Sequence, residues 1–251
     1  MRTEANGPGH RPGLFFVSRA AGARVARLPG MHAFVRSFVL PAPGVVAVLA
    51  AAGRIIRVVG GDDPREDRAV RALQSAFGHG PDAAPVESAE HREVLDRVTG
   101  PLSWYSGVPQ TIGNGAFWCG WISVLTRDWR SAAAPGAALA LETACFVGSA
   151  ALVGRPRPRG VWRPEQPHAT SSFPSGHTAA AVALHTTLAD LVDRYGVRGS
   201  RVLGPLLRYV IPGGIAFSRI YRGQHHVSDT VAGVLLGRWS ARVVRRALLS
   251  R

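Results

Sequence analysis

The chain has 251 residues, of which 46% are hydrophobic, and a formal net charge of +14. Such a charge is typical of nucleic-acid-binding proteins, but their basic side chains lie along polar faces, whereas here arginines flank long apolar runs. The composition therefore argues against a nucleic-acid partner and favours a chain embedded among membrane lipids. Cys119 and Cys145 lie in apolar stretches without metal-ligand spacing, and we interpret them as core or lipid-facing residues.

Residues 1–37 form a basic N-terminal tail that contains six arginines. No small-residue cleavage site follows a short apolar core, so we expect no removable signal peptide. Since positive charge collects on cytoplasmic flanks, we expect this tail in the cytoplasm. The rest of the chain, residues 38–251, is then the membrane domain.

Six apolar stretches approach the roughly 20 residues that a bilayer-spanning helix needs. The first, residues 38–59, holds two prolines and two arginines, so it also suits a helix that lies in the membrane interface. Because hydrocarbon leaves no partner for free backbone groups, the stretches predict an all-α membrane bundle with about six transmembrane helices. The other five stretches are 108–125, 132–153, 175–191, 202–217 and 227–248.

The polar segment 62–99 separates the first stretch from the others, with nine acidic residues against five arginines. We expect it to be a water-exposed, partly helical connection on the extracytoplasmic side. The same side would hold six arginines in two loops, against the positive-inside rule: Arg155, Arg157, Arg159, Arg163, Arg219 and Arg222. A phosphate-binding site explains this exception, because guanidinium groups bind phosphate oxygens through paired hydrogen bonds.

Three motif clusters within residues 154–229 fall at that predicted end of the bundle. The first, GRPRP at 154–158, places Arg155 and Arg157 just beyond a membrane helix, although arginines also occur at helix ends without a further role. The second, FPSGH at 173–177, ends where the next apolar helix begins, and a helix N-terminus binds anions readily.

Within the second cluster, we expect Ser175 and the backbone amide of Gly176 to face an anion. His177 lies in the first turn, where it could donate a proton to a departing oxygen. A plainer interpretation makes Ser175 an N-cap and His177 an interfacial histidine, and both roles can coexist.

The third cluster, SRIYRGQHHVSD at 218–229, combines an anion binder, a nucleophile and a carboxylate in Arg219, His225 and Asp229. Asp229 follows His225 at the helical i, i+4 spacing, so it is predicted to orient the imidazole. His226 lacks that spacing and is interpreted as a flanking residue. Ionisable residues grouped at a membrane boundary indicate a functional site.

Together the three clusters resemble the motifs of the type 2 phosphatidic acid phosphatase superfamily, which includes membrane lipid phosphatases, undecaprenyl diphosphate phosphatases and vanadium haloperoxidases. Its motifs are Lys, six residues, Arg-Pro; Pro-Ser-Gly-His; and Ser-Arg, five residues, His, three residues, Asp. The second and third motifs are complete here, and Arg157-Pro158 match the end of the first. The lysine position of the first motif is Ala150, and the chain contains no lysine.

The resemblance implies hydrolysis of a lipid phosphate or isoprenoid diphosphate at the membrane surface, with neither cofactor nor metal ion. By that resemblance His225 attacks phosphorus to form a phosphohistidine, Asp229 stabilises it and His177 protonates the leaving oxygen. The phosphoryl oxygens would be held by Arg157, Arg219, Ser175 and Gly176, with Arg155 as a partial substitute for the lysine.

Two alternatives stay open. The loss of lysine at Ala150 would also fit a membrane protein that binds lipid phosphate without hydrolysing it. A vanadium-dependent haloperoxidase would use the same anion pocket, but by resemblance such enzymes are larger soluble proteins. Isoprenoid diphosphate, phosphatidic acid, phosphatidylglycerol phosphate and glycosylated lipid phosphates all fit the pattern, and no feature of the sequence indicates an oligomeric state.

Overall fold

The computed structural model describes residues 36, 39–60, 64–80, 89–166 and 170–250, and these contain helices and no strand. The all-α prediction is therefore confirmed for this part of the chain. Most of the predicted basic tail lies outside the described residues. The helices are α2 (Pro41–Gly60), α3 (Pro64–Ala76), α4 (Ala89–Tyr105), α5 (Val108–Thr126), α6 (Trp129–Val153), α7 (Gly176–Tyr195), α8 (Ser200–Pro205), η3 (Leu206–Val210), α9 (Ile211–Tyr221), α10 (Val227–Val244) and η4 (Arg245–Leu249).

One expected helix, residues 202–217, is instead assembled from α8, the π-helical turn η3 and α9. Pro205 and Pro212 lie at the two junctions. A proline removes a backbone donor from the helix, so the hydrogen-bond pattern changes where it occurs. The polar segment 62–99 contains α3 and most of α4, in agreement with a partly helical connection.

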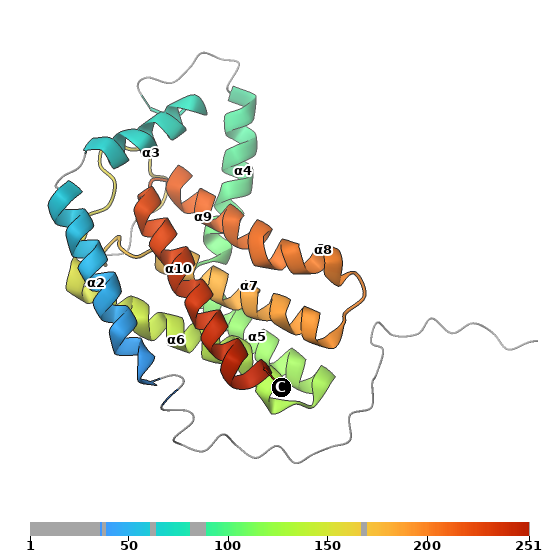
Figure 1. Ribbon diagram of the computed structural model, residues 1–251. Coiled ribbons are helices and arrows are strands. Elements are labelled where there is room, and N and C mark those ends of the chain that lie inside the picture. The colour runs from blue at the N-terminus through green and yellow to red at the C-terminus, as the bar shows by residue number, and fades with distance from the viewer. Residues whose placement is uncertain (1–35, 37–38, 61–63, 81–88, 167–169, 251) are drawn as a thin grey trace, which may run out of the picture.

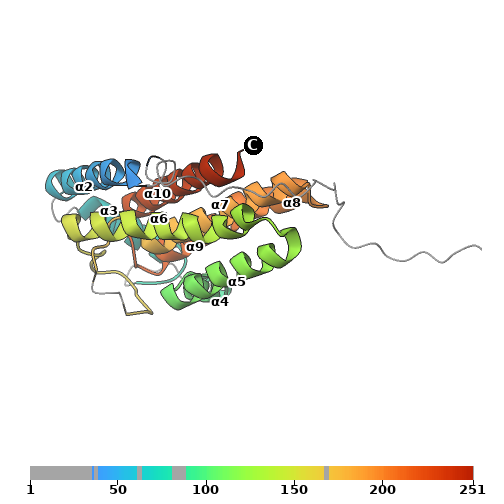
Figure 2. The same ribbon diagram turned by 90° about the horizontal axis from the view of Figure 1, so that it is seen from below.

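Helices α6 and α7 form the middle of the bundle. Figure 2 shows α2 and α10 on one side of α6, and α4 and α5 on the other. Helix α7 is almost completely buried from Thr178 to Leu191, and most of its side chains there are small or branched. One apolar cluster joins α5, α6, α7 and η4, and a second joins α2, α6, α7 and α10. The motif-bearing ends of α7 and α10 therefore stand on a packed core.

Direct backbone contact brings the N-termini of α7 and α10 together. A Cβ on Gly233 would lie 2.5 Å from the carbonyl oxygen of Ser175, and one on Gly237 would lie 2.4 Å from that of Ala179. Only glycine permits so close an approach. Because these two contacts advance in the same direction along both helices, α7 and α10 are parallel and start at the same end of the bundle. Helix α3 lies at that end, beside the start of α10 (Figure 1).

Of the described helices, two are long and apolar enough to cross a membrane by length and composition, namely Pro41–Val59 within α2 and Trp129–Val153 in α6. Among the other described helices, α10 carries Asp229, Arg238 and Arg242, and the proline-broken α8 and α9 are short. The count of six spans is therefore not reproduced, although helices occupy every predicted stretch. Large apolar side chains nevertheless lie exposed along several helices, including Val48, Ile55, Ile112, Phe117, Val124, Val231 and Leu235. Large apolar side chains exposed on helices at both sides of the bundle (Figure 2) are typical of a lipid-facing protein.

Candidate active site

Two backbone hydrogen bonds link the three motif clusters at one end of the bundle, and a third lies within the third cluster. The Ser172 N–H donates to the carbonyl oxygen of Arg155 at 2.9 Å, and the Ser175 N–H donates to that of Asp229 at 2.9 Å. The His225 N–H donates to the carbonyl oxygen of Arg219 at 3.2 Å. The convergence that the sequence predicted is thus present in the fold.

His225 is buried, with 3% of its surface exposed, and one ring nitrogen is already engaged. Its Nδ1 lies 2.8 Å from the carbonyl oxygen of Ser172. A carbonyl only accepts hydrogen bonds, so Nδ1 carries the proton in the neutral ring and Nε2 keeps its lone pair. Burial lowers the pKa of His225 to about 4, which leaves the imidazole neutral at pH 7. Its Nε2 lies 3.4 Å from Nη1 of Arg157.

Asp229 contacts His226 more closely than His225. Its Oδ2 accepts from the His226 backbone N–H at 2.9 Å and lies 3.1 Å from His226 Nδ1, but 3.8 Å from His225 Nδ1. The expected hydrogen bond at i, i+4 spacing is therefore not formed. The reason is local: His226 is the N-cap of α10 and Asp229 its third residue, so the carboxylate reaches back to the cap. The interpretation of His226 as a flanking residue was wrong in this respect.

Arg155 is held by two carboxylates. Its Nη1 donates to Asp229 Oδ1 at 2.5 Å and to the Ser228 hydroxyl at 2.7 Å, while Nη2 pairs with Glu66 on α3. Asp67, the next residue on α3, lies 3.1 Å from His226 Nε2. Helix α3 therefore closes a buried charge network over the start of α10, and this network engages the guanidinium that was expected to replace the motif lysine.

Hydrogen bonds within the protein use only some of the side-chain nitrogens of Arg157 and Arg219. Arg157 donates from Nη1 to the Gln224 carbonyl oxygen at 2.7 Å, and Arg219 donates from Nη1 to the Ser103 hydroxyl at 2.6 Å. The Nε of each has no hydrogen-bond partner among the described residues. Burial lowers the pKa of Arg157, so an anion placed beside it would stabilise its charged form. Buried unpaired donors on two arginines are what an oxyanion site requires.

A cavity of about 290 Å³ opens in front of His225. Arg157, Gly176 and His177 line it together with His225, whereas Arg155, Ser175 and Arg219 lie outside the lining that the described residues form. The Ser175 hydroxyl donates instead to Thr178 at 3.0 Å. The remaining lining residues include Phe146, Val108, Ile112 and Ala180. Polar groups suited to a phosphate and apolar groups suited to a lipid chain therefore share one space.

Glycine at position 176 lets the start of α7 pack closely against Phe146 at the wall of this cavity. A Cβ there would lie 2.9 Å from the Phe146 ring, tighter than ordinary contact. Gly176 and His177 line the cavity, so the N-terminus of α7, the kind of helix end that binds anions, lies beside it.

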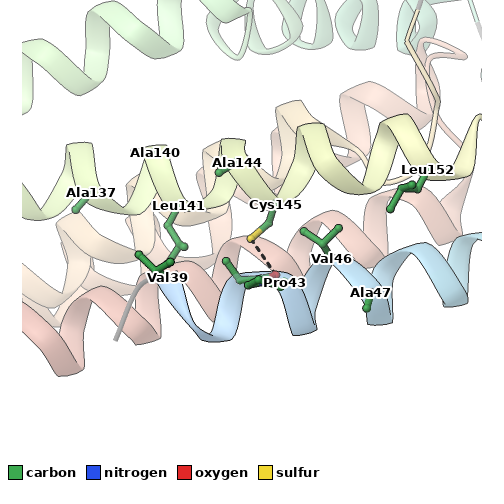
Figure 3. A pocket seen from close by; sticks show the side chains of 11 residues that line it. Val39, Pro43, Val46, Ala47, Ala137, Ala140, Leu141, Ala144, Cys145 and Leu152 are labelled. Atoms are coloured by element: carbon green, nitrogen blue, oxygen red, sulfur yellow. Dashed lines mark hydrogen bonds between the residues drawn. The ribbon is translucent and has the colours of Figure 1, made fainter. Parts of the chain in front are cut away.

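A larger cavity, of about 710 Å³, lies between α2 and α6 and has a different character (Figure 3). Its lining is apolar apart from the Cys145 thiol, which points to the carbonyl oxygen of Ala42 at 4.0 Å. The described residues that line this space offer no arrangement of polar side chains for phosphate chemistry. The polar side chains suited to phosphate chemistry line the smaller cavity at His225 instead.

Several residues of the site were missed by sequence reasoning. Glu165 accepts from Arg222 Nε at 2.8 Å and from the Ser103 hydroxyl at 2.8 Å, and its other contact is Arg219 at 3.3 Å. No local pattern marks this glutamate, or Glu66 on α3. Glu142 in α6 also lines the cavity, and a lone acid inside an apolar stretch could have been singled out. In the described part of the chain, no group of three or more His, Cys, Asp or Glu side chains is arranged to hold a metal ion.

Part of the chain and its fold are similar to known proteins. Residues 131–250, which contain all three motif clusters, match the model of the PAP2 superfamily. The fold is similar to that of a transmembrane PAP2 type phosphatidylglycerolphosphate phosphatase from Bacillus subtilis. The TM-score is 0.61 at 18% sequence identity, over 86% of this chain and 96% of that chain. None of the curated proteins matches the chain. The family resemblance and the helical membrane-protein fold are thereby confirmed.

Proposed function

We propose, on the premise that residues 131–250 match the PAP2 superfamily, that the protein hydrolyses a lipid phosphate or diphosphate at the membrane surface without a metal ion. The observation that carries the proposal is the state of His225. Its Nδ1 proton is committed to the Ser172 carbonyl, and its unprotonated Nε2 accepts a long hydrogen bond of 3.4 Å from Arg157 in a cavity that also has apolar walls. A buried neutral imidazole with one unprotonated nitrogen is a competent nucleophile once a phosphate takes over the Arg157 donor.

In the first half-reaction, the Nε2 lone pair of His225 forms a bond to phosphorus as the phosphorus bond to the lipid oxygen breaks. His177, which lines the same cavity, supplies the proton to that leaving oxygen. The phosphoimidazole formed carries positive charge. Its Nδ1 keeps its proton and donates a hydrogen bond to the Ser172 carbonyl oxygen, and the Asp229 carboxylate at 3.8 Å offsets the positive charge.

In the second half-reaction, water attacks the phosphohistidine, the bond between phosphorus and Nε2 breaks, and inorganic phosphate leaves. His177, now deprotonated, accepts the proton of that water. The lone pair returns to His225, so the ring regains its neutral state and no redox partner is needed.

Two arginines and the N-terminus of α7 stabilise the negative charge of the phosphoryl group. Arg157 is placed to donate from its unpaired Nε, and the charges of both Arg157 and Arg219 act on His225. The Gly176 amide at the start of α7 adds a donor. Such preformed donors stabilise the charge that shifts during phosphoryl transfer. We assign Ser175 and Arg155 to positioning, through Thr178 and Asp229.

A binding protein without turnover is the second candidate, and one observation favours it. The lysine position of the first motif is Ala150, in the last turn of α6, where its carbonyl oxygen accepts from the Gly154 N–H at 3.3 Å. Because alanine replaces lysine there, the first motif lacks one positive charge. We favour hydrolysis because nucleophile, proton donor and two arginines are all present without it.

The test is phosphate release from lipid phosphates and diphosphates by detergent-purified protein in the presence of EDTA. We expect release by the wild type and loss of about a thousandfold or more in His225→Ala, in line with removal of a nucleophile. Binding of the lipid phosphate without release in either protein would favour the second candidate. Release that EDTA abolishes would contradict the metal-independent mechanism.

The membrane arrangement is part of the proposal. We place the site on the extracytoplasmic side of a multi-pass protein, because the arginine-rich tail and helix links are then cytoplasmic.

A further inference from the structure

Glu142 is an acid that the proposed reaction does not use. It is the only carboxylate within α6, and 1% of its surface is exposed. Its Oε2 accepts from the neighbouring Thr143 hydroxyl at 3.2 Å, but Oε1 has no hydrogen-bond partner among the described residues. An unpaired polar atom buried in an apolar helix costs free energy, and an acid in a membrane-spanning helix calls for a functional explanation.

The position of Glu142 points to the substrate. Glu142 and Thr143 line the same cavity as His225 and Arg157. Glu142 precedes Val153, the last residue of α6, by eleven positions, which corresponds to about 16 Å along the helix axis. It therefore lies on the membrane side of the loops that hold the phosphate-binding arginines. A group that meets Oε1 would belong to the lipid next to its phosphate.

We propose that Glu142 and Thr143 form a subsite for a free hydroxyl of the substrate. The protein would then prefer glycerol-type lipid phosphates, with a hydroxyl close to the scissile phosphate, over lipids whose phosphate is attached directly to an isoprenyl chain. This inference rests on the proposed function and adds the substrate class to it.

The chemistry of the cavity favours a hydroxyl over other groups. A second anion would be repelled by a carboxylate, and a cationic group would compete with Arg157 for the phosphate. A hydroxyl both donates and accepts, so it satisfies Oε1 whether Glu142 is ionised or protonated. Sites built to hydrogen-bond a substrate hydroxyl discriminate strongly against analogues that lack it, because the buried protein group is then left unpaired.

The experiment compares two substrates that differ only in this hydroxyl: phosphatidylglycerol phosphate and its deoxy analogue, in which the free hydroxyl of the terminal glycerol is replaced by hydrogen. Wild-type kcat/KM is expected to be about ten- to a hundredfold higher for the hydroxylated lipid. Glu142→Leu should lower kcat/KM for that lipid to the level of the analogue and leave the analogue almost unchanged. Glu142→Gln, which keeps an acceptor oxygen, should retain part of the preference.

The matched control is Ser149→Ala. Ser149 is also a fully buried polar residue of α6, but its hydroxyl donates within the helix, to Cys145 at 2.8 Å, and it does not line the cavity that the described residues form. This variant should keep the wild-type preference. Equal rates of the wild type on both lipids would overturn the proposal, as would an equal loss on both lipids in Glu142→Leu, which indicates a structural or general catalytic role.

Failure of the proposed function gives a separate result, since the wild type would then release no phosphate from any lipid. In that case, measurements of lipid binding test whether the subsite exists. Detergent-solubilised wild type should bind the hydroxylated lipid more tightly than the deoxy analogue, and Glu142→Leu should bind both alike. Equal affinities in the wild type would reject the subsite independently of catalysis.

Discussion

Asp229→Asn tests whether this carboxylate supports the site through Arg155 and His226 rather than through a direct bond to His225. The substitution removes the charge and keeps the size of the side chain. Asp229 is fully buried, and Arg155 Nη1 approaches it at 2.5 Å while the His226 N–H donates to it at 2.9 Å. Breaking a buried ion pair costs about 3–5 kcal/mol, and since Glu66 still holds Arg155, we expect a loss of about 2–3 kcal/mol in unfolding free energy.

The assay is unfolding of the detergent-solubilised protein, combined with a double-mutant cycle between Asp229→Asn and Arg155→Gln. Residues in direct contact couple by about 0.5–3 kcal/mol, so the double variant should lose less than the sum of the single variants. The matched control is Asp193→Asn, which makes the same change at an acid that is half exposed and pairs with Arg208 at 3.0 Å. An exposed pair contributes about 0–1 kcal/mol. An Asp229→Asn protein as stable as the Asp193→Asn protein, yet inactive, would refute this reasoning.

Three further predictions follow from the same structure. Because burial lowers the pKa of His225 to about 4 from an unfolded value near 6.5, activity measured as kcat/KM should not fall with pH through 6.5 on account of this ring and should decline only as the pH nears 4. The unfolded chain binds the extra proton first, so this group's contribution to stability should decrease as the pH falls from about 6.5 to 4, and a contribution that grows over that window would contradict the assignment. Gly237→Ala should separate α7 from α10 and lower unfolding free energy by about 2–3 kcal/mol in denaturant melts, whereas Gly213→Ala on α9, where a Cβ meets nothing within 4 Å, should change it little. In a chain whose own two cysteines are replaced, Gln166→Cys, at an exposed position of the loop between α6 and α7, should react with a membrane-impermeant thiol reagent added outside intact cells; reaction only after permeabilisation would reverse the proposed orientation.

The sequence predicted the helices and the meeting of the three clusters well, because both depend on local pattern. Apolar runs determine where helices form, and Gly233 and Gly237 let the motif-bearing ends of α7 and α10 approach in parallel. The partners of individual side chains were predicted less well. Spacing alone suggested a bond from Asp229 to His225, but capping geometry at the start of α10 directs that carboxylate to His226.

The long-range contacts were beyond the reach of spacing arguments. Glu66 and Asp67 reach Arg155 and His226 only because α3 folds back over the end of the bundle, and no pattern in residues 62–99 encodes that placement. Glu165 is likewise separated from Arg219 by 54 residues. Such contacts depend on tertiary packing, which overrides local preference at functional sites.

The most direct test of the central claim is to trap the phosphoryl group on the nucleophile. Detergent-solubilised protein is mixed for a short time with radiolabelled lipid phosphate, quenched in alkali to preserve phosphohistidine, and digested for mass spectrometry. The account predicts an alkali-stable, acid-labile label on the peptide that contains His225, at Nε2, and no label in His225→Ala. Phosphate release at the full rate without any labelled histidine, or with the label on another residue, would contradict it.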